Sequence, residues 1–75
     1  MNLKVMRQAT GLGLREAARE AGVFASQLSE WENGKKQPSR PTLERLANFY
    51  GNRLGRRISL DQVADREPFL REVAV

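Results

Sequence analysis

Apolar residues recur at intervals of three and four positions along most of this chain, and glycine or proline interrupts the pattern repeatedly. This spacing is typical of helices that bury one face and expose the other. It predicts helices over residues 2–10, 14–21 and 24–33, a fourth from residues 39–42 to Gly51, and a short fifth between Ser59 and Pro68. We therefore expect an all-α fold, a compact bundle of four to five short helices.

The ends of these helices carry residues that favour capping. Asn2 is the expected N-cap of the first helix. Gly22 and Gly51 are expected to end the second and fourth helices. Ser59 and Gln62 have the spacing of a capping box, which predicts the start of the fifth helix.

The third predicted helix has the most informative pattern. At 100° per residue, Phe24, Leu28 and Trp31 fall on one side, which predicts that Trp31 lies in the core rather than serving as a stacking platform. Polar residues fall on the other side, among them Ser26 and Glu30. Only a short turn around Gly22 separates this helix from the second. Two short helices joined in this way are typical of a helix-turn-helix.

Composition narrows the range of functions. With 75 residues, the chain has room for one small domain. It has 13 Lys and Arg against 9 Asp and Glu, and this net charge of +4 favours a polyanionic partner. The sequence has neither Cys nor His, which excludes a disulfide scaffold, a thiolate zinc site and cysteine catalysis. We expect no enzymatic activity, no metal, no cofactor and no small-molecule ligand.

The same sequence gives an expectation for cellular location. Its apolar runs are too short for a transmembrane helix. The first residues, Met1 to Lys4, lack the apolar stretch of a secretion signal. We therefore expect a cytoplasmic protein with no membrane partner.

Several motifs together resemble the Cro/C1-type (XRE) helix-turn-helix family of bacterial and phage DNA-binding regulators. The most specific stretch is Trp31-Glu32-Asn33-Gly34-Lys35, followed by Pro38-Ser39. It is supported by Gly11-Leu12, Glu16-Ala17-Ala18, Gly22-Val23, Leu28-Ser29-Glu30 and the later Leu43, Leu46 and Ala47. The resemblance covers roughly residues 2–64. It implies a lambda-repressor-like DNA-binding domain over residues 1–65, with residues 66–75 as a C-terminal tail for dimerisation or partner binding.

The resemblance also implies roles for individual residues. Residues 14–21 would lie across the DNA backbone, and residues 25–32 would enter the major groove. The residues implied to contact bases are Ala25, Ser26, Gln27 and Glu30. Those implied to bind phosphates are Arg40 and the loop residues Asn33, Gly34, Lys35 and Lys36, the loop through its backbone N–H groups and lysine charges; Arg15 is added as a candidate phosphate-binding residue from this sequence itself. Arg7 and Glu32 match a buried ion pair between the first and third helices; the alternative is that both are solvated.

Three positions depart from the family pattern. Leu14 stands where relatives have a glutamine that binds phosphate, and Arg15 is a candidate replacement. Phe24 stands where a Ser or Thr usually caps the third helix, so the cap is lost or moved, and Phe24 packs inward against Trp31 in one interpretation. Glu30 is often basic or an amide. Its carboxylate would accept a hydrogen bond from cytosine N4, brace a neighbouring Arg or repel the DNA backbone.

The functional hypothesis is a homodimeric, sequence-specific regulator bound to an inverted-repeat operator in double-stranded DNA. A regulator that covers a promoter would act as a repressor. By analogy with the family, the protein would be a Cro-like switch of a phage or mobile element, located at the bacterial nucleoid. The candidate dimer surface comprises Phe49, Phe69, Leu70 and Val73; alternatively, the tail folds onto its own subunit. Arg53, Arg56 and Arg57 either contact DNA, contact a partner or only add charge. The alternative hypothesis is a protein-binding regulator, such as an antitoxin that masks its partner through residues 66–75.

Overall fold

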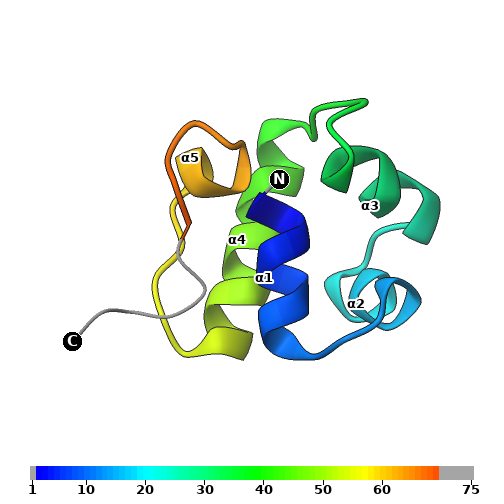
Figure 1. Ribbon diagram of the computed structural model, residues 1–75, viewed down its shortest axis with the longest axis horizontal. Coiled ribbons are helices and arrows are strands. Elements are labelled where there is room, and N and C mark those ends of the chain that lie inside the picture. The colour runs from blue at the N-terminus through cyan, green and yellow to red at the C-terminus, as the bar shows by residue number, and fades with distance from the viewer. Residues whose placement is uncertain (1, 70–75) are drawn as a thin grey trace.

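A computed structural model describes residues 2–69, and these form five helices and no strand (Figure 1). The helices are α1 (Asn2–Thr10), α2 (Leu14–Ala21), α3 (Ala25–Glu32), α4 (Arg40–Leu54) and α5 (Leu60–Val63). Helices α1 and α4 run through the middle, with α2 and α3 on one side and α5 on the other (Figure 1). The all-α prediction is confirmed.

The core forms where the apolar stripes of the helices meet. Met6 from α1, Leu28 from α3, and Leu46 and Tyr50 from α4 are completely buried. The small residues Ala17, Ala18 and Ala21 form the buried face of α2 and allow close contact with neighbouring helices. Trp31 is half-buried and packs against this core, as predicted. Each large buried side chain contributes on the order of 1.5–3 kcal/mol to folding.

The start of α1 is tied to the far end of the chain. The backbone N–H of Asn2 donates to the Asp65 carboxylate at 2.6 Å. The Asn2 side chain donates to the carbonyls of Gln62 at 2.8 Å and Glu67 at 2.7 Å. The prediction that Asn2 caps α1 was therefore wrong: Asn2 is its first helical residue, and the acceptor comes from Asp65. This arrangement joins α1 to the segment after α5.

The turn between α2 and α3 follows the prediction at Gly22. This glycine has a φ of 77°, in the left-handed region that glycine adopts most easily. The backbone N–H of Gly22 donates to Arg19, and that of Val23 donates to Ala18 at 2.9 Å, which satisfies the last carbonyls of α2. The chain thereby reverses within a few residues and places α3 against α2.

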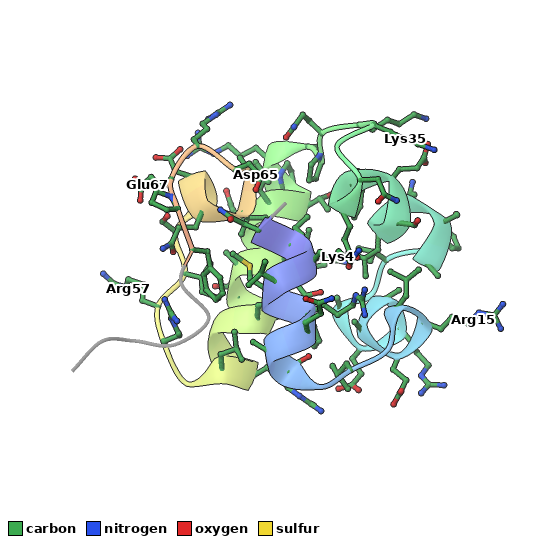
Figure 2. All side chains as sticks on the ribbon, in the orientation of Figure 1. Lys4, Arg15, Lys35, Arg57, Asp65 and Glu67 are labelled. Carbon is green, nitrogen blue, oxygen red and sulfur yellow. The ribbon has the colours of Figure 1, made fainter. Side chains whose placement is uncertain are left out.

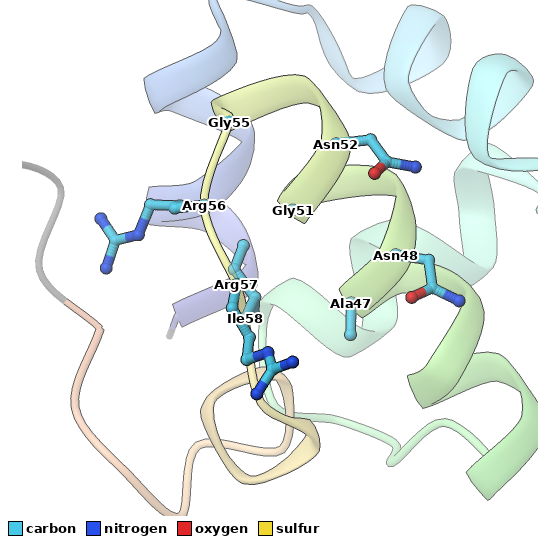
Figure 3. A pocket seen from close by; sticks show the side chains of 8 residues that line it. All are labelled: Ala47, Asn48, Gly51, Asn52, Gly55, Arg56, Arg57 and Ile58. Atoms are coloured by element: carbon cyan, nitrogen blue, oxygen red, sulfur yellow. The ribbon is translucent and has the colours of Figure 1, made fainter.

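Gly51 has a different role from the one predicted. Helix α4 continues through Gly51 and ends before Gly55, whose φ is 67°. A Cβ atom at Gly51 would lie 2.9 Å from the Arg56 carbonyl oxygen, because the segment after α4 folds back along the helix (Figure 3). The Gly51 carbonyl accepts hydrogen bonds from the N–H groups of Gly55 and Arg56. Gly51 therefore permits a close backbone contact and does not end the helix.

The predicted capping box of α5 is confirmed. The Ser59 hydroxyl accepts from the Gln62 N–H at 3.1 Å, and the Gln62 side chain accepts from the Ser59 N–H at 3.0 Å. Helix α5 ends at Val63, earlier than the predicted end at Pro68. Asp65 adopts a left-handed conformation with φ of 63°, and the Arg66 N–H folds back onto the Asp61 carbonyl. This turn stops the helix before the proline.

The segment after α5 contributes to the core. Phe69 is only 7% exposed, and the Arg56 guanidinium lies 4.5 Å from the centre of its ring. Phe69 is thus not part of an exposed dimer surface, because its ring is covered by its own chain. Phe49 is half-buried against the core, and Leu70 and Val73 lie outside the described residues. The boundary after residue 65 stays a prediction.

Within residues 2–69, no helix has the length and hydropathy needed to cross a membrane.

Candidate nucleic-acid interface

The exposed face of α3 carries most of the side chains that were predicted to contact bases. Ser26 and Gln27 are exposed, and Glu30 is partly exposed one turn further along. Ala25 is half-buried and packs against the core, so only part of its methyl surface is accessible. The structure therefore brings Ser26, Gln27 and Glu30 together on one polar surface.

The turn after α3 uses its backbone N–H groups internally. The N–H groups of Asn33, Gly34 and Lys35 donate to the carbonyls of Ser29, Trp31 and Glu30 at 3.0, 3.2 and 2.9 Å. The expectation that the N–H groups of these three residues hold phosphates was therefore wrong, because they end α3 instead. Phosphate binding at these positions would rest on the side chains of Asn33 and Lys35.

Cationic side chains project from the side of the molecule where α2 and α3 lie (Figure 2). Arg15 from α2 and Lys35 from the turn after α3 project from the same side of the molecule (Figure 2). Within residues 2–69, neither side chain forms an ion pair with a carboxylate. Arg57 projects from the opposite side of the molecule (Figure 2).

Two further predicted phosphate-binding residues have carboxylate partners. Lys36 Nζ lies 3.6 Å from Glu30 Oε2, and Arg40 Nε lies 3.6 Å from Glu44 Oε1. Both pairs are solvent-exposed, and such pairs contribute only about 0–1 kcal/mol. The cations can therefore exchange these partners for an anionic ligand at little cost. The cation beside Glu30 is thus Lys36, and not the arginine that one of the sequence-based alternatives named.

Arg7 and Glu32 form the ion pair that the resemblance implied. Arg7 Nε donates to Glu32 Oε2 at 2.7 Å, and Nη2 donates to Oε1 at 3.1 Å. The third nitrogen, Nη1, donates to the Leu12 carbonyl at 3.2 Å. The hydrogen bond with Glu32 raises the pKa of Arg7 above its ordinary value. The pair fixes α1 to the end of α3, and it neutralises a carboxylate that is 5% exposed.

Two departures from the family pattern have distinct structural outcomes. Leu14 is half-buried and packs against the core at the start of α2, so this position contributes packing rather than an anion contact. Phe24 is the N-cap of α3 and makes no side-chain cap hydrogen bond. Its side chain is 74% exposed. The interpretation that Phe24 packs inward against Trp31 was wrong, because the core covers little of the ring.

A hollow of about 480 Å³ lies between the start of α3 and the start of α4. Gln27 and Trp31 line it from α3, Phe24 from the N-cap of that helix, and Arg45 from α4. Arg45 Nη1 donates to the Gly22 carbonyl at 3.2 Å, so this cation is held at the turn before α3. Arg45 was not among the residues that the sequence predicted to contact DNA. The signal available in the sequence was that Arg45 directly precedes Leu46, at the polar edge of the apolar stripe of the fourth predicted helix.

A family model described as a helix-turn-helix domain matches residues 2–54, which include α1 to α4 in full. The chain belongs to this helix-turn-helix family. In this helix-turn-helix domain, α2 and α3 are the paired helices, and the turn at Gly22 joins them. The match confirms the family resemblance that the sequence indicated.

The domain is also similar to a larger regulator. It is 41% identical over 49 residues to the HTH-type transcriptional regulator DdrOP3 of Deinococcus deserti. The aligned region covers 65% of this chain but only 38% of the relative. The chain therefore spans well under half of that protein. No solved structure matches the chain.

Proposed function

We propose that this helix-turn-helix domain binds double-stranded DNA sequence-specifically and regulates transcription. The observation that carries the proposal is the polar face of α3, flanked by Arg15 and Lys35 on the same side of the molecule. A helix of this size fits the major groove, and flanking cations reach phosphates on either side. The relative's name, a transcriptional regulator, supports the same role.

The side chains on α3 suit specific base contacts. The Gln27 amide can both donate to and accept from adenine, and the Ser26 hydroxyl can pair with several bases. Glu30 can accept from cytosine N4. In that case Lys36, now 3.6 Å from Glu30, would turn to a phosphate. Base recognition therefore rests chiefly on Gln27 and Glu30.

We propose that two copies bind one operator. A single α3 spans only a short half-site, and two-fold pairing doubles the sequence that is recognised. The half-site centres would then lie about 34–36 Å apart, one turn of DNA. A dimer covering a promoter would exclude polymerase, which makes repression the expected outcome. The domain over residues 1–65 would bind DNA, with residues 66–75 contributing to dimer or partner contacts.

Selection of bound duplexes from a random pool, at near-physiological salt, tests this proposal. Enrichment of an inverted repeat is expected. An enriched single half-site would support DNA recognition and contradict the dimer. If folded protein enriches no sequence, the DNA proposal fails and a protein-binding role becomes the better hypothesis.

The substitution Gln27→Ala tests the base contact. We expect the preference at one base pair of each half-site to weaken by roughly 1–3 kcal/mol, because the bidentate amide is lost. Parallel selections with the wild type and Gln27→Ala measure this change. Gln37→Ala, an exposed glutamine in the loop after α3, is the matched control. An unchanged preference profile in Gln27→Ala would remove Gln27 from the base-contacting set.

A further inference from the structure

Among residues 2–69, Phe24 is the large hydrophobic residue whose side chain is exposed to solvent. A Ser, Thr, Asp or Asn at this position would supply a cap hydrogen bond to α3. Phe24 supplies none, and at 74% exposure it adds little to the core. Neither capping nor core packing therefore accounts for a phenylalanine here.

The surroundings of the ring combine apolar and cationic groups. Phe24 lines the hollow between α3 and α4, together with Trp31, Pro38 and Pro41. Lys36 and Arg45 lie at the same hollow, and none of its lining residues is acidic. A lining of mixed polar and apolar residues with two cations, of which only Lys36 has a carboxylate nearby at 3.6 Å, fits an anionic ligand that also presents apolar surface. The edge of a DNA duplex is such a ligand.

The position of Phe24 at the N-cap of α3 indicates which part of the duplex it reaches. Phe24 precedes Gln27 by three residues, and both side chains line the hollow. The first turn of a recognition helix is the part that approaches base edges most closely. A phenyl ring has no hydrogen-bonding group, and the C5 methyl of thymine is the apolar group on the major-groove edge of the bases.

We propose that Phe24 is a specificity-determining residue that packs on the C5 methyl group of a thymine next to the base pair contacted by Gln27. Arg45, held at the Gly22 carbonyl, binds the neighbouring phosphate with its remaining N–H groups. This inference rests on the proposed DNA-binding function. It extends that function, because the family comparison implied base contacts only at Ala25, Ser26, Gln27 and Glu30.

The test replaces single thymines in the selected operator with deoxyuridine, which lacks only the C5 methyl group. Binding is measured for the wild type and for Phe24→Ala. For the wild type, one replacement in each half-site is expected to weaken binding about fourfold, the effect of one buried methyl group. For Phe24→Ala the same replacement should change binding by less than about 1.5-fold. Phe24→Leu, which keeps an apolar side chain, should retain part of the methyl effect.

Several outcomes would overturn the inference while leaving the proposed function intact. One is a specific operator that has no thymine beside the Gln27 position. Another is a deoxyuridine penalty that is equal in wild type and Phe24→Ala. A third is a uniform loss of affinity for all duplexes in Phe24→Ala, which would place the ring on the sugar-phosphate backbone. Circular dichroism of Phe24→Ala should match the wild type, since the ring is mostly exposed.

Discussion

At the scale of single residues, Tyr50 combines complete burial with a polar group. Its hydroxyl finds no hydrogen-bond partner within residues 2–69. Burial raises the pKa of Tyr50 above its ordinary value of 10.0, and the nearby Glu32 carboxylate raises it further. The phenol is therefore kept neutral, and its hydroxyl adds little to stability. Tyr50 therefore stabilises the fold through the packing of its buried ring.

This environment predicts a loss of stability at high pH. In the unfolded chain Tyr50 ionises near pH 10, whereas in the folded chain it ionises only at higher pH. The unfolded state therefore binds fewer protons above pH 10, and the free energy of unfolding falls as pH rises. The slope from this group approaches about 1.4 kcal/mol per pH unit. The raised pKa of Arg7 keeps that residue protonated throughout this range.

Urea unfolding of the wild type and of Tyr50→Phe between pH 8 and pH 11 measures this effect. The difference between the two proteins isolates the contribution of Tyr50 from that of every other group in the chain. Below pH 9 we expect Tyr50→Phe to be as stable as the wild type or more stable, because a buried unpaired hydroxyl costs free energy that phenylalanine avoids. Above pH 10 the variant should become relatively more stable. Parallel curves at all pH values would contradict the assignment.

At the scale of the helices, the Arg7–Glu32 pair determines how α1 holds α3. Removing Arg7 leaves a carboxylate that is 5% exposed without its partner. We expect Arg7→Ala to reduce the free energy of unfolding by about 3–5 kcal/mol. Arg40→Ala is the matched control, because its pair with Glu44 is exposed and contributes about 0.3–0.5 kcal/mol. Urea unfolding of both variants measures the difference, and equal effects would show that the Arg7 pair is not buried in solution.

Gly51 tests the contact between α4 and the segment after it. Alanine at an ordinary helical position is favoured over glycine by about 1 kcal/mol. Here its Cβ would meet the Arg56 carbonyl at 2.9 Å, and overpacking of this kind costs about 1–3 kcal/mol. We expect Gly51→Ala to be net destabilising in thermal unfolding. Asn52→Ala, on an exposed neighbouring position, should change stability by less than about 0.5 kcal/mol. A stabilised Gly51→Ala would show that the segment moves aside easily.

The five helices also show which structural features the pattern of apolar residues predicts and which it does not. Periodicity located all five, because each buries a stripe at helical spacing. The prediction was wrong at Gly51, because a glycine needed for a close backbone contact has the same sequence pattern as one that ends a helix; its contact, Arg56, comes only after the following turn. The prediction was wrong at Asn2, because the acceptor for the start of α1 is Asp65, which is distant in the sequence. The Arg7–Glu32 pair was implied by the family resemblance, whereas the exposure of Phe24 and the placement of Arg45 depend on tertiary packing and were not foreseen.

At the scale of the whole molecule, the distribution of charge matters more than its sum. The net charge of +4 does not show where the cations lie. In the structure Arg53 pairs with Glu20 at 2.9 Å, and Arg57 projects from the side opposite to Arg15 and Lys35. The proposed DNA-binding face is therefore served by a subset of the basic residues. Removing charges from different sides should have different effects, even though the net charge changes equally.

The salt dependence of DNA binding measures that difference. Lys35→Ala removes a proposed phosphate contact, so it should weaken binding to all duplexes alike. It should also reduce the slope of log affinity against log salt concentration by about one unit. Arg57→Ala removes the same charge from the opposite side and should leave the slope unchanged. If both variants lower the affinity for DNA equally, the domain attracts DNA through its overall charge. That result would contradict the proposal that the face around α3 is the contact surface.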